Sequence, residues 1–311
     1  MCKFLVHFRM IHTIQYVQSD DIDVQKWDMM VDHNMNGRVF VFSWFLSAFC
    51  KWDAIILGDY EAGIPLPVSR LWGLRALLQP SFIQQCCWVG EMPNETGIKK
   101  IRQLIREHFI VVEFNSNLSL HSEVKKRDNL ILDISNPKIV YGNYHKTLKK
   151  NLNKSLKNHT ISYQENAAQT IQFYRDAYGH VSKHLTNEVF DRLLELIQKK
   201  SSNFINLHVF YNKEVTASLL FAVGKDRLHY ILGAPNRLGR KQNSLSVGIH
   251  DIITQPRQER FILDFEGSSI PSVRNFYQSF GTVNEPFYEI TDHHPLIKPV
   301  VKIYNKLFRF N

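Results

Sequence analysis

Phe261-Ile-Leu-Asp-Phe-Glu-Gly267 alternates between two faces in the manner of a β-strand. The aromatic and leucine side chains share one face, while Asp264 and Glu266 share the other. Gly267 ends the strand. Ser268-Ser-Ile-Pro271 then suits a helix start. A serine side chain there accepts hydrogen bonds from the unpaired backbone amides, and proline fits the first helical turn. The segment therefore predicts a strand that delivers two carboxylates to the beginning of a helix.

The predicted helix is Ser272-Val-Arg-Asn-Phe-Tyr-Gln-Ser-Phe-Gly281. Apolar side chains recur at i, i+3, i+4 and i+7 on one face that we expect to be buried, namely Val273, Phe276, Tyr277 and Phe280. Gly281 stands where helices commonly end in a left-handed residue. The partial positive charge at the helix start faces the two carboxylates. Such a joint either serves chemistry or is an ordinary connection whose acids stabilise the free amides.

Length and composition limit the kind of protein. A chain of 311 residues with 44% apolar content buries a sizeable core and is long enough for two domains. No apolar run reaches the roughly 18–20 residues that cross a bilayer. Residues 1–9 are too short and interrupted for a secretory signal, and we interpret them as an upstream start. Four cysteines without a C-x-x-C pair indicate reduced thiols in a cytoplasm, with no disulfide partner and no metal site.

Charge is distributed unevenly along the chain. Residues 1–140 carry 15 basic and 15 acidic side chains, whereas residues 141–311 carry 23 basic and 14 acidic ones. The whole net charge of +9 therefore lies in the second half. A basic domain attached to a neutral one indicates an anionic partner such as a phosphate, a nucleic acid or a membrane surface.

The first half reads as alternating strands and helices. We expect one strand at Arg38–Phe42 and the last one at Asn129–Asp133. Several polar and aromatic residues have no evident part in building a sheet, and we interpret them as lining a cleft shared between the halves; they are Trp52, Asp53, Gln79, Gln84 and Gln85. Simple packing of these loops is the alternative.

The second half begins after a boundary between Asn136 and Gly142. A helix predicted at His145–His159 has a narrow leucine stripe, and lysines that include Lys149 and Lys150 cover the rest. This helix is either a solvated connection or a phosphate-binding face that contacts substrate. Beyond it, strands and helices alternate around three consecutive central strands up to Ile290, an α+β layer arrangement.

This order of elements resembles the GNAT acyltransferase fold. Phe276-Tyr-Gln-Ser-Phe-Gly281 looks like the family's Y-x-x-x-G motif, and the basic helix together with Asp264-Phe-Glu-Gly267 is similar to the Fem-type aminoacyltransferases. The resemblance implies two tandem GNAT-like domains, each a mixed central sheet flanked by helices. Residues 10–140 would be a degenerate N-terminal domain and residues 141–311 the C-terminal acyltransferase domain.

The resemblance also implies roles for site residues. Tyr277 would protonate the leaving group, and Glu266 and Asp264 would act as bases or bind the substrate ammonium. The loop before the helix at Ser244 concentrates cations and free amides, and we expect it to bind the phosphates of the donor through Arg237, Gly239, Arg240, Lys241, Asn243 and Ser244. A tyrosine packed in the core and acids that stabilise a helix start are the structural alternatives.

The chain departs from the family pattern in two places. Arg237-Leu-Gly-Arg-Lys-Gln-Asn243 does not match the usual Q/R-x-x-G-x-G/A loop, and Thr282 replaces the usual aromatic residue. These departures favour another activated acyl donor, such as aminoacyl-tRNA, over acyl-CoA, or a lost activity; acyl-CoA and aminoacyl-tRNA are the two donors that we expect, and the acceptor is an unspecified amine. The rival hypothesis is a non-catalytic GNAT scaffold that binds a phosphate-bearing ligand.

The C-terminal tail, Pro295–Phe310, has apolar residues at helical spacing on one side and basic residues on the other. Two interpretations compete. The tail docks on the protein, crossing back to the first domain, or it lies on an anionic membrane as a peripheral contact.

Overall fold

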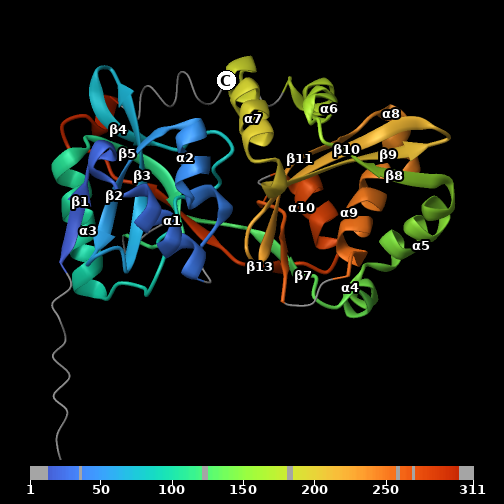
Figure 1. Ribbon diagram of the computed structural model, residues 1–311, viewed down its shortest axis with the longest axis horizontal. Helices are drawn as coiled ribbons and strands as arrows, with labels where there is room; N and C mark the ends of the chain where they lie inside the picture. Colours follow the sequence, from blue (N-terminus) through green and yellow to red (C-terminus); the bar gives the residue numbers. More distant parts are fainter. Residues whose placement is uncertain are drawn as a thin grey trace, which may run out of the picture.

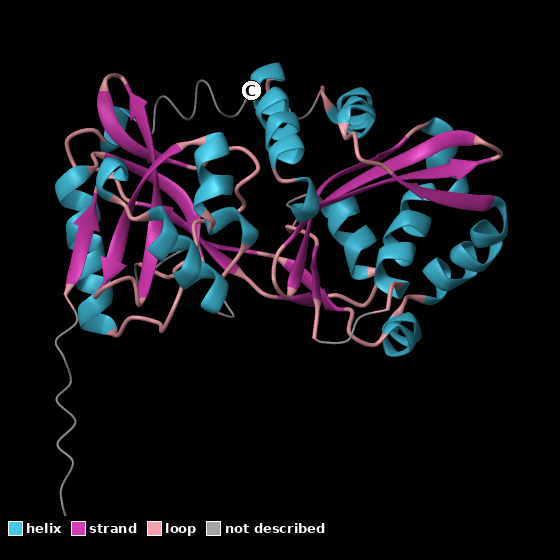
Figure 2. Cartoon of the chain, viewed as in Figure 1, coloured by secondary structure: helices cyan, strands magenta, loops and turns pink. Residues whose placement is uncertain are grey.

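The fold is taken from a computed structural model of the chain, which describes residues 13–34, 37–120, 125–180, 185–256, 260–267 and 270–300. Two lobes lie side by side, each built on its own sheet (Figures 1 and 2). The first lobe is mostly the N-terminal half of the chain and the second mostly the C-terminal half. The expected α+β arrangement of two tandem GNAT-like domains, each with a mixed central sheet flanked by helices, is confirmed.

Seven strands form the sheet of the first lobe. In spatial order they are β1 (Ile14–Val17), β2 (Lys51–Leu57), β3 (Ala62–Leu71), β4 (Leu74–Leu78), β5 (Val111–Ser116), β14 (Phe287–Thr291) and β6 (Lys125–Arg127). All neighbours are antiparallel except β4 and β5, which are parallel.

The sheet of the second lobe repeats this plan. In spatial order its strands are β8 (His159–Tyr163), β9 (Phe204–Tyr211), β10 (Glu214–Val223), β11 (Arg227–Pro235), β12 (Ile262–Asp264), β7 (Leu130–Asp133) and β13 (Val283–Asn284). Again the fourth and fifth strands, here β11 and β12, form a parallel pair. The two lobes therefore share one topology.

The lobes exchange one strand each. β14 follows the whole second lobe in the chain, yet it lies between β5 and β6 of the first sheet. β7 precedes the second lobe and the expected boundary near residue 140, yet it lies between β12 and β13 of the second sheet. Both exchanged strands take the sixth position, so no single cut in the chain separates the two sheets.

Helices cover the faces of the sheets. They are α1 (Val24–His33), α2 (Ser43–Phe49) and α3 (Glu95–His108) in the first half, and α4 (Pro137–Asn143), α5 (Lys146–Ser155), α6 (Ala168–Tyr178), α7 (Asn187–Lys199), α8 (Arg237–Gln242), α9 (Ser244–Thr254) and α10 (Pro271–Gln278) beyond. The lysine helix and the helix after Pro271 are present close to their predicted bounds. The serines expected to cap α10, Ser268 and Ser269, lie outside the described residues.

The strand expected at Arg38–Phe42 is wrong. Val39–Val41 forms a 3-10 turn in which all three side chains are buried. The β-branched and aromatic composition that predicts a strand instead fills the core, and the Val41 carbonyl accepts a hydrogen bond from the Trp27 indole at 2.7 Å. Hydrophobic burial here prevails over strand propensity.

A shared aromatic cluster joins the lobes. Phe82 of the first lobe lies 5.8 Å from Phe190 on α7 and 5.5 Å from Phe49 on α2, measured between ring centroids. Trp44 of α2 contacts Phe204 at the start of β9 in the same way, at 6.4 Å. Because aromatic side chains bury large apolar areas, this contact holds the two lobes in one relative orientation.

The end of the described chain returns to the first lobe. The His294 amide donates to the Ile110 carbonyl, and Ile297 packs against the buried Ala76 and Val111. Residues 301–311, which carry most of the amphipathic pattern, lie outside the described residues, as do residues 1–9. Among the described residues, every helix is too short or too polar to span a bilayer.

Candidate active site

The predicted strand and helix meet at the boundary between the lobes. β12 spans only three residues, and Leu263 and Phe265 enter the core of the second lobe. Asp264 is completely buried on the opposite face, and its Oδ1 accepts the backbone amide of Glu266 at 2.9 Å. Glu266 has a positive φ of 62°, a conformation uncommon for a non-glycine residue. The chain thus turns sharply after Asp264 and presents the Glu266 side chain.

Asp264 belongs to a buried network of charges. Its Oδ2 accepts from Arg227 Nη1 at 2.7 Å and from Asn129 Nδ2 at 3.2 Å. Arg227 also bonds Glu285 at 2.9 Å, and Arg38 of the first lobe donates to the same glutamate at 2.7 Å. Two guanidinium groups therefore balance two carboxylates; Asp264 and both arginines are buried, while 39% of the Glu285 side chain is exposed. Such pairing is the condition under which buried charges are tolerated.

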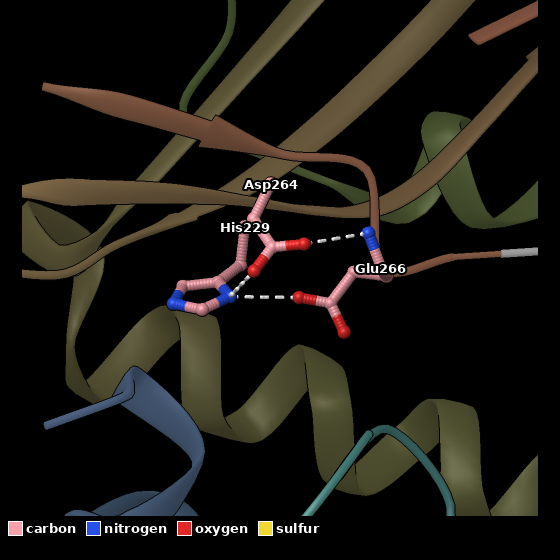
Figure 3. A group of neighbouring side chains, drawn as sticks. All are labelled: His229, Asp264 and Glu266. Carbon is pink, nitrogen blue, oxygen red and sulfur yellow. Dashed lines mark hydrogen bonds and ion pairs between the residues drawn. The ribbon is translucent and has the colours of Figure 1, made fainter. Parts of the chain in front are cut away.

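Glu266 pairs with a buried histidine. His229 Nδ1 lies 2.7 Å from Glu266 Oε1 and 3.9 Å from Asp264 Oδ2, with its ring wholly buried (Figure 3). Burial and the neighbouring guanidinium groups of Arg227 and Arg38 hold the pKa of His229 well below its usual value. The imidazole is therefore neutral at neutral pH and carries a single N–H.

Burial likewise raises the pKa of Glu266 well above its usual value. The negative charge of Asp264 acts in the same direction, and the charges of Arg227 and Arg38 act against it. The Glu266 side chain keeps 17% of its surface exposed, so it is reachable from outside the core. A carboxyl group with a raised pKa and some access to ligand is a candidate for proton transfer.

The two carboxylates and the imidazole lie close enough together for a metal-binding site to be considered. One potential ligand atom each from His229, Asp264 and Glu266 falls within 4.8 Å of the others. However, the Asp264 oxygens are taken by Arg227, by Asn129 and by a backbone amide, and a guanidinium lies 2.7 Å from the carboxylate. This arrangement fits a charge-paired network better than a cation site.

Two cavities meet at Glu266. The interlobe cavity, of about 1080 Å³, is lined by Gln84, Asn115 and Lys126 from the first lobe and by Arg274 and Gln278 of the second. The second-lobe cavity, of about 770 Å³, runs between β11, α5, α9 and α10. A short set of residues lines both cavities, namely Tyr174, Ile231, Leu232, Glu266, Gly267, Ile270 and Asn275. Glu266 is the one carboxylate among these shared residues.

Tyr277 lines the second-lobe cavity with Glu266. Its ring stacks on Phe265 at 4.7 Å and lies 6.1 Å from the ring of Tyr230, so the side chain is packed as well as accessible. Burial raises the pKa of Tyr277, and the neighbouring Tyr178 and Tyr174 add to the shift. The phenol therefore stays protonated at neutral pH and is available as a proton donor.

The expected anion-binding loop is a short helix. Asn236 caps α8 by accepting the Gly239 amide at 2.7 Å, and Asn243 at its end adopts the left-handed conformation. Gly239, Arg240 and Asn243 line the second-lobe cavity where α9 begins. The remaining predicted members, Arg237, Lys241 and Ser244, are not among the lining residues. Ser244 is buried and bonds His159 and Thr216.

Replacing Gly239 by alanine is expected to destabilise the second lobe. An added Cβ would lie 2.0 Å from the Thr216 carbonyl oxygen, so backbone must shift, and overpacking of this kind costs about 1–3 kcal/mol. Gly142→Ala is the matched control, because nothing lies within 4 Å of a Cβ at that helical position. Urea unfolding should show a lower midpoint for Gly239→Ala alone, and equal midpoints would contradict the close approach.

The first-lobe residues that were predicted to line a cleft separate into two groups. Trp52 packs on Trp27, Asp53 accepts from Arg75 at 2.6 Å, and Gln79 bonds the backbone of Asn115, all within the framework of the lobe. Gln84 does line the interlobe cavity, where its Nε2 donates to Asn129 Oδ1 at 2.9 Å. The buried Gln85 donates to Gln84. Only Gln84 of this group thus meets the cavities.

The two predicted lysines lie on α5, outside the described cavity linings. Lys149 donates to the Gly142 carbonyl at 2.6 Å and lies over the Tyr141 ring, while Lys150 is exposed. Other α5 residues, His145, Thr147 and Asn151, line the second-lobe cavity. The basic helix is therefore a wall of this cavity with its lysines outside.

Sequence reasoning missed Arg227 and His229. Both lie on β11, whose register places His229 opposite Asp264 of β12. The signal was present, since Arg227-Leu-His229 alternates polar residues in an otherwise apolar strand. Its meaning depends on the β11–β12 pairing, which joins segments more than thirty residues apart in the chain.

Comparison with known proteins shows the fold. No protein-family model and no curated protein matches the chain. Among solved structures, FemX is similar over 92% of this chain and 99% of its own, with 11% identity and a TM-score of 0.69. A conserved protein of unknown function from Bacteroides thetaiotaomicron covers 90% of this chain and 100% of its own, with 10% identity and a TM-score of 0.61.

The L-PGS of Bacillus licheniformis is similar over 90% of this chain and 94% of its own, with 11% identity and a TM-score of 0.56. These likenesses extend over both lobes, and they agree with the shared topology of the two sheets. The chain therefore has a tandem GNAT-like fold, which it shares with FemX.

Proposed function

We propose that this protein transfers an activated acyl or aminoacyl group to an amine acceptor, with Glu266 as the general base. The observation that carries the proposal is the position of Glu266 where two cavities meet. A two-substrate transfer needs one site for the donor, one for the acceptor, and a base between them. The similarity to FemX and to L-PGS supports an acyl-transfer chemistry on this fold.

The donor would lie in the second-lobe cavity. Its phosphates would approach the start of α9, because Arg240 and the first α9 residues line the cavity there and no side chain caps this helix start. The aromatic walls, Tyr230, Phe265 and Phe276, suit an apolar portion of the donor. The reactive carbonyl would then reach the Glu266 end of the same cavity.

The acceptor would enter through the interlobe cavity. Glu266 would take a proton from the amine as its nitrogen attacks the acyl carbonyl, so that the new amide bond forms without a charged nitrogen. The bond from the carbonyl to the leaving oxygen or sulfur would then break, and Tyr277 would supply the proton that this atom needs. The raised pKa of Glu266 favours uptake of the proton, and the raised pKa of Tyr277 keeps its phenol protonated until the leaving group departs.

Acyl-CoA and aminoacyl-tRNA remain the two donors to compare. The α9 start with Arg240 would receive phosphates of either. The position of α5 favours aminoacyl-tRNA, because its exposed Lys150 and Lys154 and the following Lys157 lie beyond the cavity wall, where a larger polyanion would extend.

Donor binding is the test of the second-lobe cavity. Calorimetry with acetyl-CoA and with aminoacyl-tRNA should show binding of one donor, and Arg240→Ala should weaken it about tenfold or more through loss of a charge-assisted hydrogen bond. Arg192→Ala is the control, because this exposed arginine of α7 is absent from the cavity linings. Equal binding by all three proteins would reject the assigned phosphate site.

Transfer itself is tested with a labelled acyl or aminoacyl group and a panel of amino acids, lysyl peptides and aminosugars as acceptors. Appearance of a labelled amide supports the enzyme. Donor binding without transfer to any acceptor favours the rival hypothesis of a non-catalytic scaffold.

A further inference from the structure

We infer that His229 is a positioning residue for the base: its Nδ1–H holds one oxygen of Glu266 so that the other is presented to the junction of the two cavities. This inference rests on the proposed role of Glu266. It assigns a function to a buried side chain that lines neither cavity and that the transfer chemistry does not otherwise use.

Two hydrogen bonds fix Glu266, one at its carboxylate and one at its backbone amide. Oε1 lies 2.7 Å from His229 Nδ1, and the backbone amide of Glu266 is bonded to Asp264 Oδ1 at 2.9 Å. Figure 3 shows the second oxygen of Glu266 pointing away from the imidazole. Since His229 faces Asp264 in the β11–β12 register, both restraints come from neighbouring strands and not from loops.

The ring itself has little freedom. His229 is completely buried, and Phe40 of the first lobe packs edge-to-face against it at 4.5 Å between centroids. The charged groups near it are Arg227 on the same strand, Arg38 beside Phe40, and the carboxylates of Asp264 and Glu266. A rigid neutral donor beside one carboxyl oxygen is what orientation of a base requires.

The arrangement argues against a proton relay through the ring. A relay needs a second partner at Nε2 to pass the proton onward, and among the described residues no hydrogen-bond partner reaches this buried nitrogen. The proton of the amine would therefore stay on Glu266 until it leaves through the cavities. His229 acts on the orientation and on the ionisation of Glu266.

Two substitutions separate positioning from simple packing. His229→Asn keeps an N–H near the position of Nδ1, whereas His229→Leu keeps similar bulk and removes the donor. We expect His229→Leu to lower kcat/KM about tenfold to a hundredfold, the usual range for a lost hydrogen bond to a charged group. We expect His229→Asn to recover most of that loss.

The pH dependence of the rate distinguishes the two explanations, because a loss of packing alone does not change the pKa of Glu266. A hydrogen bond donated to the ionised carboxylate favours ionisation and lowers the pKa of Glu266 relative to the same site without the donor. In His229→Leu the acidic limb of the pH–rate profile should therefore move upward by about one to two pH units. In His229→Asn it should stay near that of the original protein.

His208→Leu is the matched control. His208 is also a buried histidine of a central strand, β9, with burial lowering its pKa and no described partner at Nε2, but it lines neither cavity. This variant should keep the original pH profile even where it loses stability. Circular dichroism and unfolding midpoints of all variants identify any that fail to fold.

The ionisation of Glu266 is also measurable without turnover. Infrared difference titration of the carboxylate band, with Glu266→Gln as the reference, should show an upward shift in His229→Leu and none in His229→Asn. Folded His229→Leu with an unmoved titration overturns the inference. A protein that shows the shift but transfers no acyl group from either donor would reject the proposed function and leave the pairing of His229 with Glu266 supported.

Discussion

Replacing Glu266 by glutamine is expected to lower kcat/KM for acyl transfer by about 10²- to 10⁴-fold, the usual contribution of a general base. Glutamine has nearly the same shape and fits the same place beside His229, but it cannot accept the proton of the attacking amine. Donor binding in the second-lobe cavity should change little, because the phosphates are expected at the other end of this cavity. The measurement is the initial rate of labelled amide formation.

Glu195→Gln provides the comparison for this variant. This carboxylate lies exposed on α7, pairs with Lys199 at 3.7 Å, and lines neither cavity, so its loss should leave the rate unchanged. A Glu266→Gln protein with the original rate would place the base elsewhere.

Replacing Glu266 by glutamine also affects the stability of the fold. The pKa of Glu266 is raised on folding, so the unfolded chain ionises at lower pH than the folded one. Folding therefore becomes less favourable as pH rises from the usual glutamate range toward the folded-state pKa. The Glu266→Gln variant has no carboxyl group there and does not lose this stability as the pH rises. Its unfolding midpoint should equal or exceed that of the original protein at pH 8.

Arg227→Met is expected to produce the largest loss of stability. The guanidinium bonds both Asp264 and Glu285, and its side chain is only 7% exposed. Removing it leaves a fully buried carboxylate beside Asn129 without its counter-charge. Breaking a buried ion pair in this way costs about 3–5 kcal/mol. Urea unfolding at pH 7, followed by circular dichroism, measures the change.

Arg106→Met is the contrasting variant. Arg106 forms a bidentate pair with Asp292 at 2.8 and 2.9 Å, but its side chain is half exposed. Exposed pairs contribute about 0–1 kcal/mol, so this change should be small. Similar losses for the two variants would show that burial of the Arg227 network has no special weight.

The sequence predicted the second lobe better than the first. The alternation around Asp264 and the apolar face of the following helix are local patterns, and β12, α10 and the burial of Phe280 follow them. Glu266 and Tyr277 indeed line one cavity with Gly239, Arg240 and Asn243. These residues lie within about forty positions of one another, where spacing in the chain still carries spatial information.

Contacts between distant segments could not be predicted in this way. His229 acquires its meaning only through the pairing of β11 with β12, and Arg38 only through Glu285, almost 250 positions away. The amides at Gln79 and Gln84 show the same limit. Both looked alike as loop residues, yet one bonds the backbone of its own lobe and the other lines the interlobe cavity.

The exchange of β7 and β14 has a consequence for how the protein is made. During synthesis β5 emerges early, but its antiparallel neighbour β14 is translated about 170 residues later. At 5–20 residues per second the growing chain waits roughly ten to thirty seconds with that edge unpaired. An open strand edge is a template for wrong pairing with other chains. Until β14 is translated, the sheet of the first lobe therefore keeps an open edge at β5, and β6 lacks the strand with which it pairs.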